Sequence, residues 1–208
     1  MSTLTVVRHA QARPFQPNAD SLSEAGEQQA RALREYWARN AISFDEVWCG
    51  SLTRHSQTAA LAVDQSPILS PDWNEYDAEG ILRGYPPPWS FPDNRAFQKV
   101  FEAAMDRWLE GSVDGAEPFP EFRDRVLRAL RRIQDGASNR RVVVFSSGGP
   151  IGVLVQTALA APDRSFLEVN WRVRNCSLTE FVFSKDRFAL DSFNALPHLS
   201  EPRLQTFR

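Results

Sequence analysis

Short apolar runs that predict β-strands recur along the chain. Residues 4–7 form one such run at the start, and residues 46–49 form a second. The run 142–145 is apolar at every position, which is typical of a strand covered on both faces. Residues 176–183 and 188–193 predict two late strands. The pattern therefore predicts a sheet assembled from the beginning, the middle and the end of the chain.

Segments with apolar residues at helical spacing separate these strands. Ser23 is a candidate N-cap for a helix over roughly 24–39, and a second helix is expected over 53–63. Residues 97–108 and 122–133 each present one apolar helical face. Strands that alternate with helices predict an α/β three-layer sandwich with a mostly parallel central sheet.

The whole chain, residues 1–208, is expected to form a single domain. A chain of this length can bury a sizeable core without a disulfide or metal to stabilise it. The prolines in the stretch 84–92 exclude a regular helix or a central strand there. We therefore expect roughly residues 80–120 to be a helical insertion on the main domain.

Composition and charge narrow the range of partners. The chain has 24 Lys and Arg against 26 Asp and Glu, a net charge of −2. It therefore has no overall positive charge that would attract nucleic acid or an anionic membrane. No apolar run approaches the ~18 residues that cross a bilayer, and the N-terminus lacks the apolar core of a signal peptide. A cytoplasmic protein is expected, and an anionic ligand would need a local positive pocket.

The cysteines indicate neither a disulfide scaffold nor a metal site. Cys49 and Cys176 are the only two, and they lack the spacing of zinc ligands. We expect both to be reduced, buried thiols. No other cluster of ligand residues suggests a metal, so neither a metal nor a cofactor is predicted.

Residues that can carry chemistry follow three predicted strands. Arg8-His9 ends the first, Arg54 comes shortly after the second, and Ser146–Gly149 follows the third along the chain. In open α/β sheets, sites form at the carboxyl ends of strands. Two arginines and a glycine-rich helix N-terminus would make an anion pocket, in which a neutral imidazole can attack phosphorus. Taken alone, however, Arg8-His9 is more often a solvated strand end.

The order of the motifs adds to this interpretation. The segments Val7–Ala10, Leu22–Ala30 and Ser51–Ala59, taken together, resemble the histidine phosphatase superfamily, also called phosphoglycerate mutase-like. The first and third segments are specific in combination. The resemblance covers nearly the whole chain and extends to weaker matches at Glu75, at the strand-turn-helix of 142–155 and at Asn194–Leu199.

The resemblance implies a role for each matching residue. His9 matches the nucleophile that forms a phosphohistidine, and Arg8 and Arg54 match the phosphate-binding arginines. Glu75 resembles the acid that protonates the leaving oxygen and then activates water; Asp77 is its nearest competitor, and a surface loop carboxylate is the alternative. The implied reaction is hydrolysis of a small phosphorylated substrate without metal or cofactor.

One departure bears directly on activity. Ser147 stands where the superfamily usually has a second histidine, and losing such a donor typically costs about 3–4 kcal/mol of transition-state stabilisation. The Ser147 hydroxyl and the backbone N–H groups of Gly148 and Gly149 are expected to contact phosphate and recover part of this. His55 is another candidate substitute, but on a helix it points about 100° away from Arg54, which favours an exposed or packed histidine.

Three other functions stay open. Loss of the second histidine is compatible with a protein that binds an anion without turnover. A mutase of the phosphoglycerate type is disfavoured because the only long lid candidate is the segment near 80–120. The order Ser147, Asp191, His198 is that of an α/β-hydrolase triad, although Phe145 occupies a position where the nucleophile elbow needs glycine.

Overall fold

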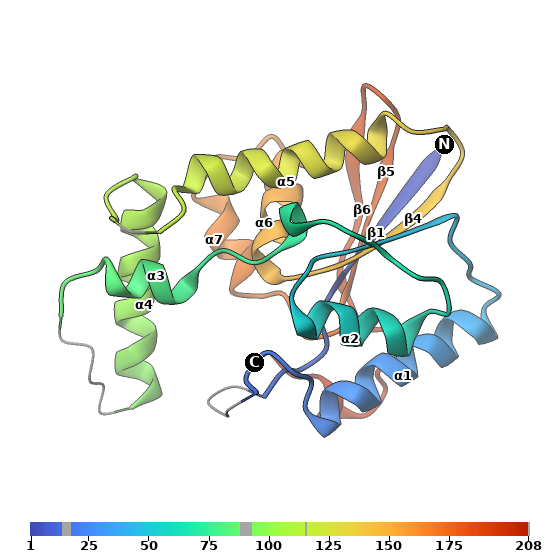
Figure 1. The fold of residues 1–208 in the computed structure, drawn as a ribbon, viewed down its shortest axis with the longest axis horizontal. Helices are drawn as coiled ribbons and strands as arrows, with labels where there is room; N and C mark the ends of the chain where they lie inside the picture. The colour runs from blue at the N-terminus through green and yellow to red at the C-terminus, as the bar shows by residue number, and fades with distance from the viewer. Residues whose placement is uncertain (14–17, 88–92, 115, 208) are drawn as a thin grey trace.

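A six-stranded sheet forms the centre of the protein (Figure 1). The computed structural model describes residues 1–13, 18–87, 93–114 and 116–207. The strand order is β3-β2-β4-β1-β5-β6. Strands β1 to β4 pair in parallel, and β5 runs antiparallel to both of its neighbours. The prediction of a mostly parallel sheet is confirmed. The strands are β1 Ser2–Arg8, β2 Glu46–Cys49, β3 Ile68–Leu69, β4 Arg141–Ser146, β5 Leu178–Phe183 and β6 Phe188–Ala195.

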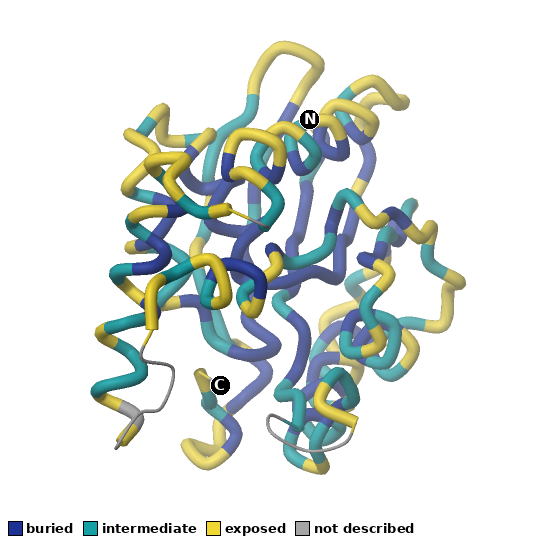
Figure 2. Tube along the Cα trace, turned by 60° about the vertical axis from the view of Figure 1, so that its left-hand side comes forward, coloured by how far each residue is buried: buried dark blue, intermediate teal, exposed yellow. Residues whose placement is uncertain are grey.

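Helices cover both faces of this sheet, which confirms the three-layer sandwich. Alternate residues of the central strands face opposite layers, so Val142 and Val144 pack with α5 and α6 while Val143 and Phe145 pack with α1 and α2. Figure 2 shows the strands buried between helices whose outer surfaces are exposed. The helices are α1 Glu24–Arg39, α2 Thr53–Ala62, α3 Ala78–Arg83, α4 Asn94–Leu109, α5 Phe119–Gln134, α6 Gly148–Ala158 and α7 Ser165–Asn170, with 3-10 turns η1 Pro71–Trp73 and η2 Pro202–Leu204.

Helices α3 and α4 carry most of the segment predicted to be an insertion. They lie at one end of the molecule in Figure 1. Met105 and Trp108 of α4 are buried in the same apolar cluster as Val142 and Val144 of the sheet. The segment therefore shares the main core, and its status as an insertion stays a prediction. The end of the proline-rich stretch, residues 88–92, lies outside the described residues.

The start of the first helix agrees with the sequence pattern. Ser23 caps α1, accepting a hydrogen bond from the Gly26 N–H at 3.0 Å. Helix α6 spans Gly148–Ala158. Ser147 is its extended N-cap residue, and the helix ends before Ala160, which has a positive φ of 49°.

Candidate active site

The carboxyl ends of three parallel strands meet at one edge of the sheet. Arg8, the last residue of β1, pairs with Ser146, the last residue of β4. The His9 N–H then donates to the Ser146 carbonyl at 2.8 Å. Cys49, which ends β2, pairs with Phe145 on the other side of β4. The strand-end motifs identified in the sequence therefore lie next to one another.

His9 is held in one tautomer by its own chain. Its Nδ1 lies 2.8 Å from the Ala10 carbonyl oxygen, so Nδ1 carries the proton and donates, and the lone pair is on Nε2. Burial lowers the pKa of His9 well below its ordinary value, and the charges of Arg54 and Arg8 lower it further. The ring is consequently neutral near pH 7, as a nitrogen nucleophile must be.

Both predicted phosphate-binding arginines contribute charge to this space. Arg54, early in α2, forms an ion pair with Asp20. Arg8 donates to the backbone carbonyls of Val173 and Phe207, the latter at 2.9 Å. Asp20 was not predicted to lie at the site, because an acidic residue in a polar loop carries no signal of its partner.

Glu75 reaches the same space from the segment that follows η1. Its Oε1 accepts the Gly149 N–H at 2.9 Å and the Tyr76 N–H at 3.3 Å. Burial raises the pKa of Glu75, while the charges of Arg54 and Arg8 oppose that rise. Since the charges of the same two arginines affect both His9 and Glu75, the four predicted side chains lie close together at this edge of the sheet.

The Gly149 contact changes one part of the sequence interpretation. Its N–H was expected to face a phosphate, but it holds the Glu75 carboxylate instead. A Cβ at this position would lie 2.1 Å from Glu75 Oε1, so only glycine permits the contact. Gly148 begins α6 directly after Ser147 and lies against Asn170.

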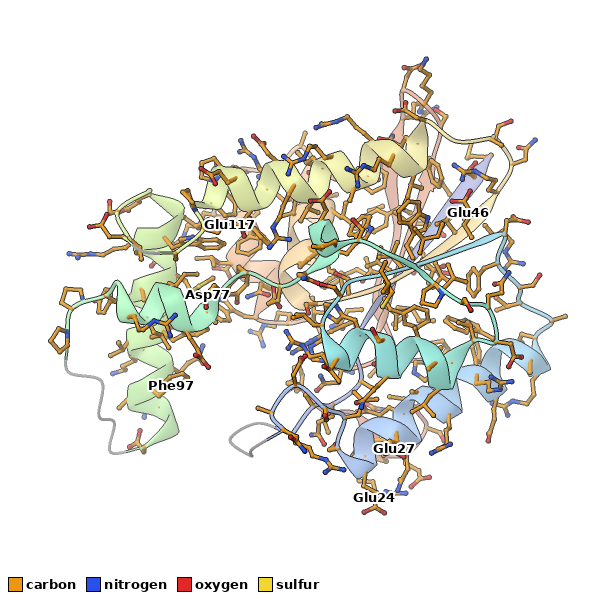
Figure 3. The ribbon with its side chains drawn as sticks, in the orientation of Figure 1. Glu24, Glu27, Glu46, Asp77, Phe97 and Glu117 are labelled. Atoms are coloured by element: carbon orange, nitrogen blue, oxygen red, sulfur yellow. The ribbon has the colours of Figure 1, made fainter. Side chains whose placement is uncertain are left out.

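Arg125 of α5 fixes the backbone that carries Glu75. Its guanidinium donates to the carbonyls of Asn74 at 2.8 Å and Glu75 at 3.2 Å. Glu117 accepts from it at 2.7 and 2.9 Å (Figure 3 labels Glu117). Arg125 was not predicted to lie at the site, although its place between the buried Phe122 and Val126 put it near the inward face of α5.

Asp77, the competitor for the acid role, faces elsewhere. Its carboxylate accepts the Gly80 N–H at 2.8 Å and so caps α3, and it lies 3.6 Å from the Arg83 guanidinium. The side chain is exposed at the start of α3 (Figure 3). Glu75, in contrast, contacts the N-terminus of α6.

His55 faces the site, contrary to the direction expected from its place beside Arg54. It is fully buried, and its Nε2 lies 2.6 Å from the Ser147 hydroxyl oxygen. Of the two alternatives expected for His55, exposed or packed, the structure shows the packed one, and the residue against which it packs is Ser147. Spacing could have shown this, because His55, Thr58 and Ala59 form the buried face of α2.

The alternative serine hydrolase triad is wrong. The partner of Ser147 is His55, whereas Asp191 lies in the middle of β6, away from the strand ends. His198 packs near Tyr36, with ring centroids 6.3 Å apart.

We expect His198 to make the fold sensitive to acid. Burial lowers its pKa from 6.5 to about 4, with a backbone contact to Cys176 partly offsetting the shift. The unfolded chain therefore binds more protons between these values, and the free energy of unfolding falls as pH drops below 6.5. At about pH 5 this amounts to about 2 kcal/mol.

Denaturant unfolding at about pH 7.5 and pH 5 measures this effect. His198→Gln, which cannot titrate, is expected to lose about 2 kcal/mol less than the wild type over that range. Equal losses in both proteins would show that other groups cause the acid sensitivity.

Neither the two cysteines nor a cluster of metal ligands adds further chemistry to this site. Burial raises the pKa of Cys49 to about 12 and also raises that of Cys176, so neither is a thiolate near pH 7. Within the described parts of the chain, His, Cys, Asp and Glu nowhere gather in a group of three that could hold a metal ion. None of the helices described here is both long enough and apolar enough to span a bilayer.

The protein is an α/β sandwich in which two arginines lie near a buried histidine at the carboxyl edge of the sheet. The family model of the histidine phosphatase superfamily (branch 1) matches residues 4–196, and the chain belongs to this superfamily. The resemblance seen in the sequence motifs is thereby confirmed.

Curated relatives cover most of the chain. A protein named probable phosphoglycerate mutase from Erwinia tasmaniensis is 29% identical over 86% of this chain and 84% of its own length. The uncharacterized phosphatase PhoE of Bacillus subtilis is 23% identical over 96% of this chain and 98% of its own.

Solved structures share the fold. A mutant phosphoserine phosphatase from Entamoeba histolytica in complex with phosphoserine has a TM-score of 0.71 at 20% identity, covering 96% of this chain and 100% of that one. A mycobacterial glucosyl-3-phosphoglycerate phosphatase in complex with vanadate has a TM-score of 0.69 at 20% identity, covering 93% and 98%.

Proposed function

We propose that the protein is a phosphomonoester hydrolase that acts on a small phosphorylated substrate through a phosphohistidine at His9. The observation that carries the proposal is the His9 tautomer. The Ala10 carbonyl fixes the proton on Nδ1, which leaves a nucleophilic lone pair on Nε2 near the charges of Arg8 and Arg54.

Each step has a residue to perform it. Arg8 and Arg54 hold the phosphoryl oxygens, and His9 Nε2 attacks phosphorus in line with the leaving oxygen. As the N–P bond forms, the P–O bond to the leaving group breaks, and the protonated Glu75 gives its proton to the departing oxygen. Glu75, now a carboxylate, takes a proton from water, which attacks phosphorus and returns the N–P electrons to His9.

The raised pKa of Glu75 suits this double role. A carboxyl whose pKa is raised by burial keeps its proton closer to neutral pH than an exposed one does. A neutral His9 and a protonated Glu75 can therefore exist together at mildly acidic pH, which is the state that begins the reaction.

A trapping experiment tests the proposal. The protein is mixed with p-nitrophenyl phosphate and quenched in alkali, and the His9 peptide is examined by mass spectrometry. We expect nitrophenol release together with a phosphorylated His9 that survives alkali and is lost in acid. Binding of inorganic phosphate without either signal would instead identify a protein that holds an anion without turnover.

The names of the fold neighbours suggest which natural substrates to try first. Phosphoserine and glucosyl-3-phosphoglycerate are the compounds in those names, and both are small phosphomonoesters. Assays with 3-phosphoglycerate separate hydrolysis from a mutase reaction. A hydrolase releases inorganic phosphate, whereas a mutase returns the phosphoryl group to the product as an isomeric phosphoglycerate.

A further inference from the structure

A second imidazole lies beside the proposed nucleophile. The ring centroids of His55 and His9 are 5.7 Å apart, and His55 Nε2 is 2.6 Å from the Ser147 hydroxyl oxygen. Ser147 immediately follows the β4 residue that pairs with Arg8, so Ser147 and His9 lie at the same level of the sheet edge. Ser147 is also the N-cap of α6, yet its side chain makes no capping hydrogen bond.

The surroundings of His55 indicate which of its nitrogens carries the proton. Nδ1 is buried and has no hydrogen-bond partner within the described structure. A buried N–H without an acceptor is rarer than a lone pair without a donor. Burial, together with the charge of Arg54, lowers the pKa of His55, so the ring is neutral. The proton is therefore on Nε2 and is donated to Ser147 Oγ, which leaves the Ser147 hydroxyl proton available for another acceptor.

Gly50 makes room for this imidazole. A Cβ on residue 50 would lie 2.2 Å from His55 Nδ1, closer than real Cβ contacts come. The 2.6 Å separation between His55 Nε2 and Ser147 Oγ also leaves no space for a ring at residue 147. The residues at positions 50, 55 and 147 therefore depend on one another. The imidazole of His55 fits only because residue 50 is glycine and residue 147 is serine.

We propose that His55 is a positioning residue that donates through Nε2–H to Ser147, whose hydroxyl donates onward to a non-bridging oxygen of the bound phosphoryl group. Hydrogen bonds in such a chain polarise and strengthen one another. The His55–Ser147 relay thus supplies a donor to the position where this chain lacks a histidine. The inference rests on the proposed function and names a part of that site.

Exchanging the two side chains tests the relay. His55→Leu, His55→Ala, His55→Gln, Ser147→His and the double variant His55→Ala/Ser147→His are compared by calorimetric binding of phosphate and orthovanadate. Turnover of p-nitrophenyl phosphate gives kcat and KM separately. His55→Leu is expected to weaken vanadate binding and lower kcat about tenfold, with KM little changed, and His55→Gln to restore most of the loss because its amide N–H can still donate.

The double variant tests the relay more sharply than the single variants do. Ser147→His alone should lose vanadate binding because the new ring meets His55, whereas the double variant should return to within about threefold of the wild type. Gly50→Ala should impair the wild type, through contact with His55 Nδ1, more than the double variant, where only the contact with Asn74 Oδ1 at 2.9 Å remains. His198→Gln, at a buried histidine beside Tyr36, is the matched control and should match the wild type near neutral pH.

Several results would overturn the relay. Wild-type vanadate affinity in His55→Leu would do so, and so would single-variant losses that simply add in the double variant. A wild type that binds phosphate but never turns over would contradict the proposed function alone, since anion binding still decides the relay. A wild type that binds neither phosphate nor vanadate would overturn both.

Discussion

Replacing His9 with alanine is expected to reduce phosphate release from p-nitrophenyl phosphate by at least about 10⁴-fold, because no other group among the residues described at the site is free to form the intermediate. His55 Nε2 is engaged with Ser147, and both cysteine thiols are kept protonated by their burial. Inorganic phosphate should still bind, since Arg8 and Arg54 remain. Initial rates and calorimetry of the two proteins measure these two effects separately.

The pH dependence of the wild type should carry the signature of the same residue. Protonation of Nε2 removes the lone pair, so activity falls on the acid side as pH drops through the pKa of His9. Because burial, Arg54 and Arg8 lower that pKa, activity with an activated leaving group should persist below about pH 6.5, where an ordinary histidine loses its lone pair. Loss of activity already above that pH, or a His9→Ala protein with more than about one hundredth of normal activity, would assign the nucleophile elsewhere.

Much of the fold could be predicted because local pattern and tertiary environment agree. The apolar run 142–145 became the central strand β4, covered on both faces, and the expected strand at 46–49 is β2. Ser23 was identified as a cap from the residue type alone. The strand-end motifs come together because parallel strands place their carboxyl ends at one edge, so Arg8 and Arg54 could be assigned to one site.

Individual side-chain contacts between segments far apart in sequence could not be predicted. The Gly149 N–H was assigned to phosphate because nothing local to α6 announces that Glu75, 74 residues earlier, takes it. Arg125 of α5 donates a hydrogen bond to the Glu75 backbone, and no short-range sequence pattern predicts that contact. His55 was misjudged for a different reason: its direction was judged relative to Arg54 rather than from the buried face it shares with Thr58.

Glu75→Gln is expected to slow hydrolysis of alkyl phosphates about 10²–10³-fold while slowing p-nitrophenyl phosphate less than about tenfold. An alkoxide is a poor leaving group and needs the proton, whereas nitrophenolate leaves without it. In the wild type, the alkyl phosphate rate should fall as pH rises through the raised pKa of Glu75, because the acid form is lost. That alkaline decline should be absent in the glutamine variant, which cannot titrate.

Two further variants distinguish a proton donor from a merely structural carboxylate. Asp77→Asn removes the same charge two residues away, but Asp77 caps α3 and lies near Arg83, so the ratio of alkyl to aryl rates should stay normal. Gly149→Ala keeps the carboxyl and displaces it, because the new Cβ would lie 2.1 Å from Oε1, so it should lower that ratio as Glu75→Gln does. If both substrates slowed equally in Glu75→Gln, or if Asp77→Asn alone lowered the ratio, the acid would not be Glu75.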